Sequence, residues 1–187
     1  PLIYYTIREA KKSKVFSKII VSTEDKKIKK IAQKYGAEVP FLRPKNLAKD
    51  SSRAIDAIYY TFKKSEKIYG QRFDYIIELM CTNPLKKAKH IKDVAIKQIL
   101  TNADSVIAVT KLEDHHPIRI KKIVRGKIKD FCLKEIPETN RQDLKPDAYI
   151  RCGSIYSMRR DMLEKKIRYG TEESLAYIMP RERTVNI

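Results

Sequence analysis

The chain has 187 residues, of which 42% are hydrophobic, so it is long enough to bury the core of one domain and too short for two full ones. Its 41 lysines and arginines outnumber 23 acidic residues and give a formal net charge of +18. The lysines recur on the outer faces of predicted helices, without interleaved aromatic residues, which argues against dedicated nucleic-acid binding.

In chain order, the first half alternates helices and strands. The predicted helices cover residues 2–12, about 24–36, 51–62 and 91–99, and the predicted strands cover residues 18–22, 37–41, 75–80 and 105–110. Thr23 is expected to cap the second helix and Gly36 to end it. We interpret residues 75–80 as a central strand. This alternation predicts a doubly wound α/β sheet that binds ligands at the carboxyl ends of its strands.

The pattern changes after Leu112. Residues 120–124 and 127–131 are predicted to form two short strands that turn at Arg125 and Gly126, a hairpin able to leave the main sheet. A strand over 149–156, a short helix over 160–166 and a last strand over 176–179 complete the prediction. We therefore expect a single domain over residues 1–187.

Cysteine usage and hydropathy bear on location. The three cysteines have no CxxC or Cys/His metal spacing, so they predict neither a disulfide framework nor a zinc site and fit a reducing cytoplasm. No apolar run approaches the ~20 residues that cross a bilayer, and no charged-then-apolar leader opens the sequence. We expect a cytoplasmic protein with no membrane partner.

Six short motifs, in collinear order along nearly the whole chain, resemble those of the acylneuraminate cytidylyltransferases. They are Val-Ser-Thr-Glu-Asp (21–25), Leu-Arg-Pro (42–44), Thr-Asn-Pro-Leu (82–85), His-His-Pro (115–117), Arg-Gln-Asp-Leu (141–144) and Gly-Ser-Ile-Tyr (153–156). Each motif alone is weak evidence for this resemblance, whereas six motifs in the same order are strong evidence. The resemblance implies a three-layer, Rossmann-like fold with a mainly parallel sheet. It also implies a protruding dimerisation arm with a sugar-site loop over about 113–148, and hence a homodimer.

The same resemblance implies an activity and its site residues. Members of this family join CTP to an acidic nine-carbon sugar to give the CMP-sugar and pyrophosphate, with Mg²⁺ on the triphosphate. The implied residues are Arg43, Thr82 and Asn83 for the nucleotide and Arg141, Gln142, Tyr156 and, across a dimer, Arg119 for the sugar. Arginine suits a carboxylate because its planar fork donates two parallel hydrogen bonds. The family's glycine-rich catalytic loop has no match in the sequence, so no catalytic residue is assigned.

Several positions depart from the family pattern. Met80 stands where a glutamine reaches the sugar, Lys86 replaces an arginine and Cys152 replaces an asparagine. The loss of the two amide side chains at positions 80 and 152 suggests a variant nonulosonic acid, such as legionaminic or pseudaminic acid. Asn186 occupies the place of the first of two Mg²⁺-binding aspartates, and an amide oxygen is the weaker ligand for a hard cation.

Other interpretations stay open. The activity could be that of a CMP-Kdo synthetase-like enzyme, or the chain could be a truncated, non-catalytic nucleotide- or sugar-binding domain. On structural grounds alone, Asn83-Pro84 is a turn entering a helix, and Arg141 is a surface arginine. Adjacent His115 and His116 are interpreted as turn and interface residues, because sequence neighbours rarely bind one metal ion together.

Overall fold

A four-stranded sheet forms the centre of the computed structural model, which describes residues 1–113, 115–135, 140 and 143–187. The strands are β1 (Tyr75–Leu79), β2 (Ser105–Lys111), β5 (Tyr149–Arg159) and β6 (Ser174–Ile178), in the order β1-β5-β2-β6. β5 is antiparallel to β1 and β2, whereas β6 is parallel to β2. Three of the four strands therefore run in one direction, and β5 is the reversed strand of a mixed sheet.

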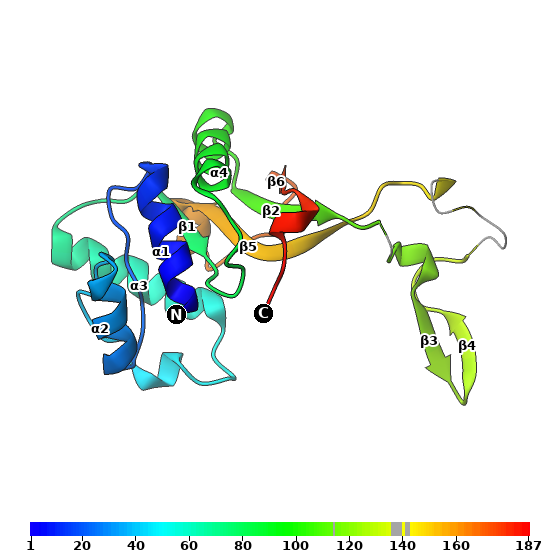
Figure 1. Cartoon of the computed structure of the whole chain (residues 1–187), viewed down its shortest axis with the longest axis horizontal. Helices are drawn as coiled ribbons and strands as arrows, with labels where there is room; N and C mark the ends of the chain where they lie inside the picture. The colour runs from blue at the N-terminus through cyan, green and yellow to red at the C-terminus, as the bar shows by residue number, and fades with distance from the viewer. Residues whose placement is uncertain (114, 136–139, 141–142) are drawn as a thin grey trace.

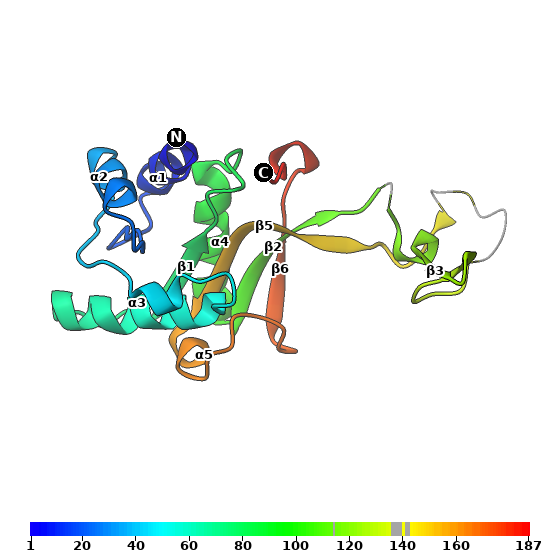
Figure 2. The ribbon, with the colours of Figure 1, turned by 90° about the horizontal axis from the view of Figure 1, so that it is seen from below.

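Helices cover both faces of this sheet (Figures 1 and 2). They are α1 (Leu2–Ser13), α3 (Ala54–Tyr69), α4 (Ala88–Thr101) and α5 (Arg160–Glu164), while α2 (Lys26–Lys34) packs against α1. Apolar residues of α1 and α4 pack with Val106 and Ile155, while those of α3 and α5 pack with Ile107 and Tyr156. Because adjacent strand residues point to opposite faces, these two cores define three layers. The predicted α/β class is confirmed.

α1 follows the prediction closely, whereas α3 ends at Tyr69 rather than near residue 62 and α4 begins at Ala88 rather than near residue 91; the start of α2 also needs a correction. Thr23 does not cap this helix. The carboxylate of Asp25 accepts hydrogen bonds from the backbone N–H groups of Lys27 and Ile28, while the Thr23 hydroxyl accepts one from Asp25 N. A carboxylate at this position satisfies two of the free amides of the first turn. None of the helices in the described part of the chain is long and apolar enough to cross a membrane.

Two predicted strands are much shorter than expected. Residues 18–22 and 37–41 make one parallel bridge, in which Val21 N donates to Glu38 O at 2.9 Å and Glu38 N donates to Ile19 O at 2.8 Å. Pro40 has no N–H, which limits how far this pairing can extend. The prediction that residues 75–80 form a central strand was also wrong, since β1 pairs only with β5 among the described strands and lies at the end of the sheet.

The predicted hairpin is confirmed and leaves the main sheet. β3 (Lys121–Val124) and β4 (Lys127–Asp130) form a separate two-stranded sheet. Arg125 and Gly126 both have positive φ, 50° and 74°, as the tightest hairpin turns require. In Figure 1 this hairpin lies well away from the four-stranded sheet, at the far end of the extended segments that continue β2 and β5. We call described residues 115–135 the arm.

Candidate ligand site at the carboxyl end of β1

The loop that follows β1 is fastened to β5 by side chains as well as backbone. Met80 N donates to Ser154 O at 3.0 Å, one step beyond the end of β1. Asn83 is fully buried; its Nδ2 donates to Cys152 O (3.3 Å) and its Oδ1 accepts from Ser154 Oγ (3.1 Å). A buried amide paired on both sides holds its loop firmly. The first task of Asn83 is therefore to fix this loop.

Lys86 fixes the same loop from beneath. Its side chain is fully buried, and Nζ donates to Thr6 Oγ1 (3.1 Å), Met80 O (2.6 Å) and Asn83 O (2.5 Å). Three ammonium donors thus meet three oxygen acceptors. Burial lowers the pKa of Lys86 to about 8. In the sequence, Lys86 was recognised only as a residue that replaces an arginine, and no surrounding pattern predicted its burial.

The last described residues meet this loop. Ile187 N donates to Thr82 O at 3.0 Å. Gly153 has φ +61°, and a Cβ there would lie 3.3 Å from Asn186 Nδ2, so only glycine lets the two segments approach without adjustment. The register between β5 and β2 also shifts at this point. The structure thus brings Thr82, Asn83 and Asn186, all predicted as site residues, to one place.

Asn186 does not by itself make a Mg²⁺ site. Within the described ranges, no group of three His, Cys, Asp or Glu side chains could hold a metal ion. Mg²⁺ prefers several hard oxygen ligands, usually with at least one carboxylate. The described residues offer one exposed amide here, which does not fit the ion without further ligands.

Two tyrosines and two arginines stack on the other face of β5, and we call Arg151, Tyr156, Arg168 and Tyr169 the Arg–Tyr stack. The rings of Tyr156 and Tyr169 stack with centroids 5.7 Å apart at 28°. The guanidinium carbon of Arg168 lies 4.2 Å from the Tyr156 centroid, and that of Arg151 lies 4.3 Å from the Tyr169 centroid. Sequence motifs pointed to Tyr156 alone, because the other three residues belong to no recognised motif.

Arg168 is further held by the end of β1. Its Nε donates to Glu78 Oε2 at 2.7 Å, and Nη2 lies 3.9 Å from Met80 Sδ. Burial raises the pKa of Glu78, although the ion pair with Arg168 opposes that shift. Met80 therefore joins the loop after β1 to the Arg–Tyr stack, where the predicted sugar residue Tyr156 lies.

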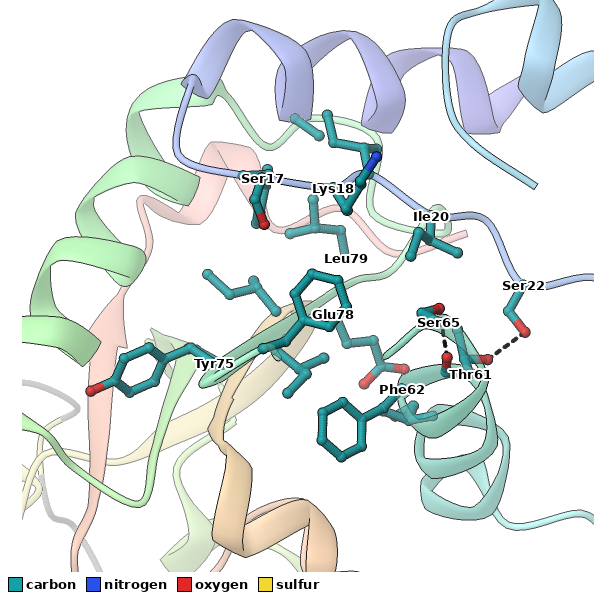
Figure 3. A pocket seen from close by; sticks show the side chains of 18 of the residues that line it. Ser17, Lys18, Ile20, Ser22, Thr61, Phe62, Ser65, Tyr75, Glu78 and Leu79 are labelled. Carbon is teal, nitrogen blue, oxygen red and sulfur yellow. Dashed lines mark hydrogen bonds between the residues drawn. The ribbon is translucent and has the colours of Figure 1, made fainter. Parts of the chain in front are cut away.

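A cavity of about 680 Å³ lies on the open side of β1 (Figure 3). Its walls come from α1, residues 15–22, α3 and β1, and Ser22 at its edge accepts a hydrogen bond from Thr61 at 2.7 Å. Arg43 and Cys81 line the same cavity. Arg43 donates to Glu24 Oε2 at 2.9 Å, and its Nε is buried without a partner among the described residues. The predicted nucleotide residue Arg43 thus shares a cavity with the loop after β1.

Arg119 and His116 lie in the arm. Arg119 is 4.0 Å from Glu135 Oε1. His116 is buried, with Nδ1 accepting from Ile118 N and Nε2 bonded to Pro146 O at 2.9 Å, so both ring nitrogens serve the turn. Arg141 and Gln142 lie outside the described residues, and their role at the sugar stays a prediction.

Open α/β sheets bind ligands in the crevice at the carboxyl ends of their strands, and this chain gathers buried polar groups and arginines there. The family model described as Cytidylyltransferase matches residues 1–180. The chain therefore belongs to the cytidylyltransferase family.

Individual relatives agree with this assignment. The chain is 30% identical to a CMP-N,N'-diacetyllegionaminic acid synthase of Campylobacter jejuni, covering all of this chain and 78% of the relative. It is 27% identical to a pseudaminic acid cytidylyltransferase of the same species, covering all of this chain and 79% of the relative. Among solved structures, a CMP:2-keto-3-deoxy-manno-octonic acid synthetase complexed with CTP has a TM-score of 0.66 at 14% identity, over 96% of this chain and 79% of that one. That likeness supports the fold alone.

Proposed function

We propose that this chain transfers the cytidylyl group of CTP to a nonulosonic acid, giving the CMP-sugar and pyrophosphate. One observation carries the proposal: Met80 contacts both groups of residues. Its carbonyl oxygen accepts a hydrogen bond from Lys86, which holds the loop after β1, and its sulfur lies against Arg168 of the Arg–Tyr stack. Similarity to legionaminic and pseudaminic acid enzymes supports the sugar class. In this proposal residues 1–187 act as one domain in the cytoplasm, with about 113–148 as the dimerisation arm and sugar-site loop.

The reaction needs positioning more than covalent chemistry from the protein. The anomeric hydroxyl of the sugar attacks the α-phosphorus of CTP; the new O–P bond forms as the bond to pyrophosphate breaks, and the hydroxyl proton passes to solvent or a base. Placing the two reactants in line supplies much of the rate. Arg43, which lines the cavity and whose buried Nε has no partner among the described residues, and Thr82 are proposed to face the nucleotide, while Tyr156, Arg141 and Gln142 are proposed to face the sugar.

A homodimer and Mg²⁺ complete the proposal. The arm exposes large apolar side chains: Ile123 is 77% exposed, Ile128 74% and Phe131 61%. An exposed apolar hairpin of this kind favours pairing with a second copy, which would bring Arg119 to the partner's sugar site. Mg²⁺ would offset triphosphate charge; since Asn186 alone does not fit the ion, the phosphates and water would have to supply most of its ligands, with Asn186 as at most one contact.

The direct test is pyrophosphate release by the full-length protein with CTP and Mg²⁺. We expect turnover with N-acetylneuraminic, legionaminic or pseudaminic acid, and none when Mg²⁺ is chelated. Turnover with the eight-carbon acid Kdo alone would replace the proposed substrate class. Affinity for CTP without any pyrophosphate release would indicate a binding domain instead, and steeply salt-dependent oligonucleotide binding without turnover would overturn the enzyme assignment.

A further inference from the structure

The two arginines of the Arg–Tyr stack differ in exposure and in ion pairing. Arg168 is 18% exposed and ion-paired with Glu78, itself 19% exposed. Arg151 is exposed at the surface of β5, and its guanidinium has no carboxylate or other hydrogen-bond acceptor among the described residues. Arg168 is therefore committed to the protein, whereas the donors of Arg151 are free for a ligand.

Charge in this cluster is unbalanced by one unit. Arg151 and Arg168 carry two positive charges, and Glu78 carries one negative charge when ionised. A ligand with a single carboxylate would complete the balance. A guanidinium is the side chain best shaped for that group, because it donates two parallel hydrogen bonds to the two oxygens.

Stacking also orients Arg151 before any ligand arrives. Tyr169 holds the guanidinium carbon at 4.3 Å from its ring centroid, and Tyr156 supports Tyr169 from the buried side. A side chain that is already ordered loses less conformational entropy when it binds. The stack therefore presents an oriented cationic fork on β5, in the same cluster as Arg168, which contacts Met80.

We propose that Arg151 is a specificity-determining residue that binds the carboxylate of the acid sugar, with Tyr169 as its positioning residue. This inference rests on the proposed function. It adds a second guanidinium to Arg141, which is predicted for the same group.

The test compares an acid with its neutral ester in the full-length protein. Calorimetry would measure binding of the acid sugar that supports turnover, or of N-acetylneuraminic acid if none does, and of its methyl ester, in the presence of CMP. A charge-assisted hydrogen bond to a carboxylate predicts a roughly 10- to 100-fold preference for the acid. Arg151→Gln should reduce that preference to about twofold or less while leaving ester affinity unchanged.

Two variants make the comparison specific. Arg151→Lys keeps the charge but loses the planar fork and its stacking, so its preference should be intermediate. Arg8→Gln removes an arginine that also lies over tyrosine rings, on α1 at the opposite face of the sheet, and should keep the wild-type preference. Equal unfolding temperatures would show that each variant is folded.

The outcomes separate this inference from the enzyme assignment. Wild-type turnover together with an unchanged acid preference in Arg151→Gln would overturn the role of Arg151 and leave the proposed function standing. An equal loss of acid and ester affinity would also overturn it, because a structural defect would act on both ligands. Failure of the wild type to bind any acid sugar would overturn both.

Discussion

At the residue scale, Lys86 combines complete burial with a role in holding the loop after β1. Burial lowers its pKa to about 8, from an ordinary 10.5. Between these values the unfolded chain binds more protons than the folded one, so the free energy of unfolding should rise with pH, by at most about 1.4 kcal/mol per pH unit. Urea unfolding from pH 7 to about 9.5 should show this rise in the wild type and its loss in Lys86→Met.

Cys152 and the tyrosines act in the opposite direction and set the upper end of the window: burial raises the pKa of the Cys152 thiol, so ionisation of this thiol in the unfolded chain lowers stability as the pH approaches 9.5. Burial and a hydrogen bond to Glu38 raise the pKa of Tyr69 to about 12, so ionisation of the unfolded tyrosine lowers stability above pH 10. Lys86→Met also leaves buried oxygens unpaired and should be less stable at every pH. A wild-type slope that persists unchanged in Lys86→Met would assign the effect to another group.

Gly153 offers a second test at this scale, with a matched glycine elsewhere. Gly153→Ala places a side chain at φ +61° and 3.3 Å from Asn186, whereas Gly70→Ala meets nearly the same φ, +59°, with nothing within 4 Å. Both should lose about 1–2 kcal/mol of stability to backbone strain. Gly153→Ala should lose more stability than Gly70→Ala, as measured by urea unfolding midpoints. Adding Asn186→Ala to Gly153→Ala should remove this additional loss. Equal losses in the two alanine variants would show that the contact with Asn186 is unimportant.

Site residues could be predicted where they belong to one short motif, but not where their contacts join distant parts of the sequence. Motifs identified Tyr156 and Asn83, which occupy recognisable short patterns. Lys86 bonds to Thr6, 80 positions away, and the stack joins Arg151 to Arg168 and Tyr169 through folding alone. The roles of these residues depend on tertiary contacts, so local sequence composition does not predict them.

At the element scale, strand prediction failed only where a strand lacks a neighbour along its length: β1 and β2 are found within one residue of their expected bounds. The first helix was expected over residues 2–12 and is found at Leu2–Ser13, because its apolar periodicity is complete within one element. Residues 18–22 are rich in β-branched side chains, yet they make only one bridge. A strand needs a neighbour along its length, and composition does not say whether the neighbour is there.

The arm is the element whose prediction concerns assembly. Ile123 and Ile128 face each other across the hairpin and are both largely exposed. If the arm pairs two copies, Ile123→Lys combined with Ile128→Lys should halve the mass measured by light scattering and raise the KM for the sugar, since Arg119 would leave the partner's site. Leu100→Lys, at an 80% exposed position on α4, is the matched control and should stay dimeric. A monomeric wild type, or a doubly substituted dimer, would contradict the assignment.

At the scale of the whole molecule, a net charge of +18 acts on an anionic nucleotide before it arrives. Exposed lysines of α2 and of the hairpin contribute to that field. A positive field raises the rate at which anions are captured and is screened by salt, so kcat/KM for CTP should fall several-fold between about 50 and 300 mM NaCl. Turnover at saturating substrate should change little, because bound groups are positioned by short-range contacts.

Distribution of the charge gives this prediction its control. α2 lies beside α1, which contributes residues to the wall of the cavity bearing Arg43, whereas the hairpin lies far from α1 (Figure 1). Replacing Lys26, Lys27 and Lys30 by glutamine should therefore lower kcat/KM for CTP at low salt more than replacing Lys122, Lys127 and Lys129. Equal effects would show that only total charge matters. A kcat/KM that does not depend on salt would leave the lysines as a solvated surface with no part in capturing CTP.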